Sequence, residues 1–101
     1  MEVFTRSKER VLEIYLNGEL DHHGARGLLI KLEVAIEASL PRELVLDFTN
    51  VTFMDSAGIA VALRGWQRMR ELGGSVKLRK VAPQPKKVLE AAGLGRMMTI
   101  E

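Results

Sequence analysis

The stretch that decides the fold runs from Leu44 to Ile59 and has the sequence LVLDFTNVTFMDSAGI. Residues 44–48 form a nearly continuous apolar run, which is typical of a central strand buried on both faces of a sheet. Residues 51–54 add apolar side chains that we expect to plug into the core. Asp55 and Ser56 follow, directly before a helical pattern, and both are preferred helix-capping residues. The stretch therefore predicts a strand, a turn and the start of a helix.

The residues after this stretch complete a crossover unit. Residues 57–72 show helical periodicity, with apolar side chains on one stripe and charged ones elsewhere. Gly73-Gly74 ends the helix, and residues 75–81 alternate as a strand does. Strand, helix and strand within residues 44–81 predict two parallel strands joined by a right-handed connection.

The residues before it predict a hairpin and a further helix. Short apolar-rich stretches lie at 3–6 and 11–17, and the second alternates as a half-buried strand does. We expect a glycine-led loop at 18–24 and then a helix over 25–40, with Asp21 as a capping or first-turn acid.

Two prolines and a short periodic stretch predict a third helix at 86–92, and residues 95–100 predict a last strand. A chain of 101 residues has enough core for one domain, residues 1–101. The expected fold class is α/β, a mixed sheet of about four to five strands packed with helices.

The composition excludes several classes of protein. There is no cysteine, which excludes disulfides, thiolate zinc sites and cysteine nucleophiles. No apolar run approaches the roughly 18 residues of a membrane helix, and the first residues do not begin a signal peptide. We therefore expect a cytoplasmic protein with no membrane partner.

The net charge of +2 is unevenly distributed. Residues 64–96 carry nine basic and two acidic side chains, whereas the other 68 residues carry six basic and eleven acidic ones. Such asymmetry indicates either a charged partner or solvated faces. Because only Trp66 is a plausible stacking aromatic in that half and no nucleic-acid-binding motif occurs, we expect no direct nucleic-acid contact.

Ser56 is the candidate for covalent chemistry. A serine in the first turn of a helix exposes its hydroxyl, and the free N–H groups and positive dipole end there can hold a phosphate. Phosphorylation would add about −1.5 to −2 charges. Beside Asp55, and near Asp21 if the two loops meet, that charge would repel a partner that docks on the neutral form. A plain helix cap explains the same residues.

Hydrolytic and metal chemistry fit the sequence poorly. The serine-hydrolase elbow needs glycine two residues before the serine and a late histidine. Met54 stands at that position, and the two histidines, His22 and His23, come early in the chain. Adjacent histidines in a loop point apart, and no H-x-x-x-H spacing occurs, so we expect no metal site.

The run 44–48, followed by Phe53-Met54-Asp55-Ser56-Ala57-Gly58-Ile59, resembles the signature of the STAS domain in bacterial anti-sigma factor antagonists. The segment Gly18-Glu19-Leu20-Asp21-His22-His23 narrows the resemblance to the sporulation type. The similarity extends from about Val11 to Ile100. Asp-Ser-x-Gly alone is moderately specific, but together with Gly-Glu-Leu-Asp-His-His at this distance it is strong.

The resemblance implies a single STAS domain that is not an enzyme and uses no cofactor. In the unmodified state such proteins bind an anti-sigma factor, itself a serine kinase carrying ATP or ADP, and so free the sigma factor. The kinase then phosphorylates the serine that falls on Ser56 here, the complex dissociates, and a serine phosphatase removes the phosphate.

The resemblance also implies a docking surface. Asp21 matches the family's loop aspartate and Asp55 the acid before the serine, so we expect both near that surface, with His22 and Gly58 from the same motifs. An alternative remains open: a STAS-type ligand-sensing or scaffold module in which Ser56 only caps a helix.

Overall fold

The computed structural model describes residues 1–101, and its centre is a five-stranded sheet in the order β1-β2-β3-β4-β5. Strands β1 (Glu2–Lys8) and β2 (Val11–Leu20) form the antiparallel hairpin that the sequence predicts. Strands β3 (Glu43–Met54), β4 (Ser75–Arg79) and β5 (Thr99–Ile100) continue the sheet, and each pairs in parallel with the strand before it. The predicted α/β class and mixed sheet are confirmed.

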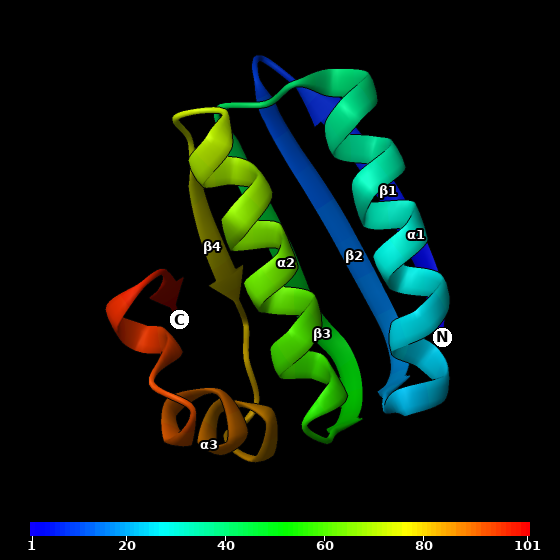
Figure 1. The fold of residues 1–101 in the computed structure, drawn as a ribbon. Helices are drawn as coiled ribbons and strands as arrows, with labels where there is room; N and C mark the ends of the chain where they lie inside the picture. Colours follow the sequence, from blue (N-terminus) through cyan, green and yellow to red (C-terminus); the bar gives the residue numbers. More distant parts are fainter.

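Two helices cover one face of the sheet. Helix α1 (His22–Ser39) connects β2 to β3, and helix α2 (Ala57–Glu71) connects β3 to β4. Because both crossovers step in the same direction along the sheet, right-handed connections place both helices on the same side (Figure 1). Helix α3 (Pro83–Ala91) and a short 3-10 helix (Leu94–Arg96) follow β4. No helix combines the length and the apolar character needed to cross a membrane.

The hydrophobic core lies between the sheet and helices α1 and α2. Alternate residues of β2 and β3 form the sheet side of the core, and residues of α1 spaced three to four apart pack onto them. The fully buried members from these elements are Leu12, Ile14, Leu16, Leu20, Leu28, Leu32, Ile36, Leu44, Leu46, Phe48 and Met54. The apolar periodicity of the sequence therefore identifies the faces that pack.

The structure corrects three predicted boundaries. Gly18 does not end the second strand: its positive φ of 120° accompanies a register shift, so β2 continues to Leu20. The loop expected at 18–24 is therefore short, and His22 and His23 begin α1 instead of lying in a loop. Helix α3 also begins earlier, at its first proline.

The last strand is much shorter than predicted. Residues 94–96 form a 3-10 helix, and only Thr99–Ile100 pair with β4. Gly93, with a φ of 78°, turns the chain after α3, and Leu94 is buried in the core. Burial of Leu94 therefore keeps the chain in a tight turn where the local pattern suggested an extended segment.

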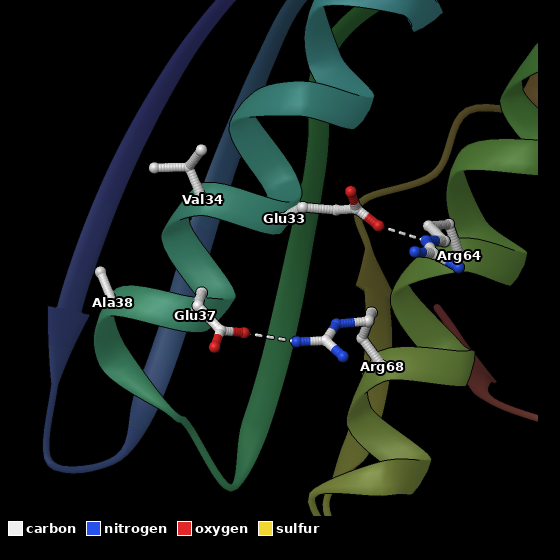
Figure 2. Close-up of a pocket in the computed structure, with 6 residues that line it drawn as sticks. All are labelled: Glu33, Val34, Glu37, Ala38, Arg64 and Arg68. Carbon is white, nitrogen blue, oxygen red and sulfur yellow. Dashed lines mark hydrogen bonds and ion pairs between the residues drawn. The ribbon is translucent and has the colours of Figure 1, made fainter.

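Ion pairs account for much of the uneven charge. Figure 2 shows a groove between α1 and α2 in which Glu33 pairs with Arg64 and Glu37 with Arg68. Four of the nine basic residues in 64–96 are paired in this way or with other acids: Arg64, Arg68, Lys77 and Arg79. The basic half of the sequence therefore partly neutralises the acidic half within the folded chain.

The face of the sheet opposite the helices carries a network centred on Asp47. The Nε group of Arg79 donates to Asp47 Oδ2 at 2.8 Å, and the Thr49 N–H donates to Asp47 Oδ1 at 2.9 Å. Arg79 also reaches Glu13 at 2.9 Å and the hydroxyl of Tyr15 at 3.3 Å. Burial raises the pKa of Asp47, but the hydrogen bonds from Thr49 and Arg79 outweigh it, so the pKa lies below its ordinary value.

A lowered pKa in the folded state means that the ionised Asp47 stabilises the fold above pH 3.8, its ordinary value, and that this contribution is lost at lower pH. Asp47→Asn is expected to lower the free energy of unfolding at pH 7 by about 1–3 kcal/mol. Urea denaturation of both proteins at pH 7 and pH 3 measures the difference, which should shrink at pH 3. A difference that does not depend on pH would contradict this role of the carboxylate.

Candidate functional site

The candidate site lies at the edge of the sheet where β2 and β3 end. Because these strands are adjacent and parallel, their carboxyl ends meet, and Leu20 pairs in register with Met54. The Asp55 N–H donates to the Leu20 carbonyl at 3.3 Å, which ties the two strand ends together. Helices α1 and α2 both begin here, at the lower end of the sheet in Figure 1. The carboxyl ends of parallel strands are where α/β proteins usually place their functional residues.

Asp21 caps helix α1. Its Oδ1 atom accepts a hydrogen bond from the Gly24 N–H at 2.8 Å, and its carbonyl accepts one from the Ala25 N–H at 2.9 Å. The hydrogen bond from Gly24 lowers the pKa of Asp21, so the carboxylate is charged at neutral pH. His22 follows in the first turn and is exposed. The structure thus places a fixed negative charge beside an exposed imidazole.

Asp55, not Ser56, provides the side-chain cap of helix α2. Asp55 Oδ1 accepts a hydrogen bond from the Ala57 N–H at 2.8 Å, whereas the Ser56 side chain makes no capping hydrogen bond. Ser56 is exposed and Asp55 is half-buried. Asp55 is therefore the helix cap, whereas Ser56 makes no cap and its hydroxyl faces solvent. Below, the group Asp21, His22, Asp55 and Ser56 is called the Ser56 edge.

The backbone corrects one expectation about this helix end. The first N–H groups of α2 are already used: Ala57 donates to the Asp55 carboxylate, Gly58 to the Asp55 carbonyl and Ile59 to the Ser56 carbonyl. A phosphate on Ser56 would therefore compete with existing hydrogen bonds if it folded back onto the helix. Projecting into solvent, it would leave these bonds intact and add its charge to the surface.

Gly58 lies beneath the Ser56 edge and is buried. A Cβ atom built there would overlap the side chain of Met54 and come within 3.2 Å of a methyl group of Leu20. The absence of a side chain thus lets the first turn of α2 approach the ends of both strands. Its predicted place near a docking surface stays a prediction.

Sequence reasoning missed two residues beside this edge. Phe53, expected as a plug of the core, is 42% exposed. Gln84, in the first turn of α3, accepts a hydrogen bond from the Met54 N–H at 2.9 Å and donates one to the Met54 carbonyl at 2.8 Å. Nothing in the Pro-Gln-Pro sequence indicates this contact, because it depends on where β4 ends relative to β3.

The side chains at the edge do not form a metal-binding constellation. No group of three or more His, Cys, Asp or Glu side chains lies close enough together to hold a metal ion. The capping of α1 and α2 occupies one oxygen of Asp21 and one of Asp55. What the edge offers is an exposed serine, with the carboxylates of Asp21 and Asp55 at the ends of the same two paired strands.

Comparison with known proteins identifies the family. The STAS domain family matches residues 3–101 of the chain. The chain belongs to the STAS domain family. The anti-sigma F factor antagonist of Paenibacillus polymyxa is 33% identical over 90 residues, which cover 89% of this chain and 77% of the relative. This STAS domain is therefore a homologue of anti-sigma factor antagonists.

Solved structures agree with this assignment. The anti-sigma factor antagonist SpoIIAA in its unphosphorylated form superposes on this STAS domain with a TM-score of 0.85 and 28% identity, covering 99% of this chain and 88% of that one. The Bacillus cell fate determinant SpoIIAA in the phosphorylated form superposes with a TM-score of 0.77 and 27% identity, covering 99% and 91%. The resemblance to sporulation-type antagonists is confirmed.

The packing at Gly58 makes a prediction about stability. Alanine normally stabilises a helix relative to glycine, and Gly27 in α1 has open space around its Cα atom. Gly27→Ala is therefore expected to raise the free energy of unfolding by about 0.5–1 kcal/mol. Gly58→Ala should instead lower it by about 1–3 kcal/mol, because the new methyl group overlaps Met54. Chemical denaturation of the two variants tests this, and a stabilising Gly58→Ala would contradict the close approach.

Proposed function

We propose that this STAS domain is an anti-sigma factor antagonist controlled by phosphorylation of Ser56. In the unphosphorylated form it binds an anti-sigma factor that is also a serine kinase, carrying ATP or ADP, and the sigma factor is freed. The kinase then transfers a phosphate to Ser56, the complex dissociates, and a serine phosphatase restores the binding form. In this function the chain acts by binding and is not itself an enzyme.

The observation that carries the proposal is that Ser56 is exposed and its hydroxyl makes no capping hydrogen bond. A kinase needs a serine hydroxyl that its active site can reach without disturbing the fold of the substrate. Because the Asp55 carboxylate caps α2, the Ser56 hydroxyl is not needed for capping. The relatives support the same function, since one is an anti-sigma F factor antagonist and another was solved in a phosphorylated form.

The charges at the Ser56 edge explain how the modification would act. Asp21, held ionised by the Gly24 N–H, and Asp55 already make this surface acidic. A phosphate adds about −1.5 to −2 charges, so a partner shaped to the neutral serine meets repulsion and a desolvation cost. Release of the partner then follows from a change of surface charge, with the fold of the domain unaltered.

Intact-mass spectrometry tests the proposal. The chain is incubated with ATP and the anti-sigma factor kinase encoded in the same genome, beside the variant Ser56→Ala. One phosphate is expected on the wild type and none on the variant, because alanine has no hydroxyl to accept it. The Ser7→Ala variant, changed at an exposed serine of β1, is the matched control and should accept one phosphate.

Two outcomes would overturn the proposal. A kinase that is active on another substrate but adds no phosphate to the wild type would favour a ligand-sensing or scaffold module. A phosphate that persists in Ser56→Ala would place the modification elsewhere in the chain.

A further inference from the structure

Strand β3 is longer than the strand beside it. The pairing of β3 with β4 ends at Asp47 and Arg79, yet β3 continues for seven more residues to Met54. On its other side β3 stays paired with β2 as far as Met54. The last part of β3 therefore has no strand partner on the β4 side, and its backbone groups on that side need other partners.

The side chain of Gln84 takes the place of a strand at the end of β3. Its Oε1 atom accepts from the Met54 N–H at 2.9 Å, and its Nε2 atom donates to the Met54 carbonyl at 2.8 Å. A carboxamide carries a donor and an acceptor side by side, as a peptide group does, so it can satisfy both backbone groups of one residue. A glutamate could accept from the N–H but, once ionised, could not donate to the carbonyl.

The backbone that carries Gln84 is itself well fixed. Pro83 and Pro85 flank it in the first turn of α3, where proline's restricted φ suits a helix start. Pro85 is buried, as is Leu89 one turn later. Helix α3 is therefore anchored in the core, and the hydrogen bonds of Gln84 hold the end of β3 against this helix.

The turn that carries Ser56 is thus held from two sides. Gln84 fixes Met54 from the α3 side, and the Leu20 carbonyl fixes the Asp55 N–H from the β2 side at 3.3 Å. Ser56 is the next residue, and its own side chain makes no capping hydrogen bond that would orient it. The position of its hydroxyl therefore depends on the backbone before it.

We infer that Gln84 is a positioning residue for phosphorylation: its two hydrogen bonds to Met54 hold the Asp55–Ser56 turn in the geometry in which the Ser56 hydroxyl attacks the γ-phosphorus of the ATP carried by the kinase. ADP is the leaving group, and the hydroxyl proton passes to a base of the kinase. This inference rests on the proposed function. Phosphoryl transfer depends strongly on alignment of the attacking hydroxyl, so a looser turn lowers the rate of the chemical step. The acidic side chains of the Ser56 edge remain in place, so the affinity for the kinase changes little.

The test replaces Gln84 by methionine, which has a similar length but no amide. Steady-state phosphorylation by the kinase with radiolabelled ATP is expected to show kcat reduced about tenfold, with KM within about twofold of wild type. Gln84→Ala is the second variant and should behave alike. The matched control is Gln67→Met, the same change at an exposed glutamine of α2, which should keep wild-type kinetics.

A second readout does not depend on the kinase. Amide hydrogen exchange followed by NMR should be at least about tenfold faster at Met54 in Gln84→Met than in the wild type, because the N–H loses its acceptor. Unchanged kcat in both Gln84 variants would overturn the positioning role, and unchanged Met54 exchange would overturn the clamp. Absence of phosphate on the wild type would instead remove the proposed function, while the exchange measurement would still test the clamp.

Discussion

The parallel pairing of β2 with β3 is the constraint on which the rest of this structure depends. It brings the carboxyl ends of the two strands to one edge, where the Asp55 N–H meets the Leu20 carbonyl. Asp21 follows one strand and Ser56 the other, so residues 35 positions apart in the sequence share one small surface. Without this pairing the two helices would not begin at one edge, and Asp21 would not lie at the same edge as Asp55 and Ser56.

The division of work between Asp55 and Ser56 is what the proposed phosphorylation of Ser56 requires. A helix needs a cap, and a phosphorylation switch needs a hydroxyl that is free to react. Because the Asp55 carboxylate binds the Ala57 N–H, both needs are met by neighbouring residues. Gly58 completes the arrangement, since its small size seats the first turn of α2 directly on Met54 and Leu20.

Much of the fold follows from short-range patterns in the sequence. The apolar run at 44–48 and the helical stripe at 57–72 predict the central crossover, and Asp21 is foreseen as a cap. The strand ends could not be predicted, because Gly18 reads as a break when taken alone. Only the pairing with β3 turns it into a bulge within a longer strand.

The site shows the same limit. The motif residues Asp21, Asp55 and Ser56 are evident from sequence, since each precedes a helix. The hydrogen bonds of Gln84 are not evident from the sequence, because they join residues 30 positions apart. They form only where β3 extends beyond the end of β4. Likewise, Phe53 lies in an apolar segment but is partly exposed, and this depends on what packs around the end of β3, which the local pattern does not specify.

The affinity of the anti-sigma factor kinase for Ser56→Asp shows whether charge at Ser56 controls docking. Ser7→Asp, which adds the same charge in β1, serves as the control. Ser7 pairs with Leu12 and so lies near the opposite end of the sheet. Binding is expected to be at least about tenfold weaker for Ser56→Asp, with wild-type affinity for Ser7→Asp and unchanged circular dichroism for both. Equal affinity of Ser56→Asp and wild type would contradict it.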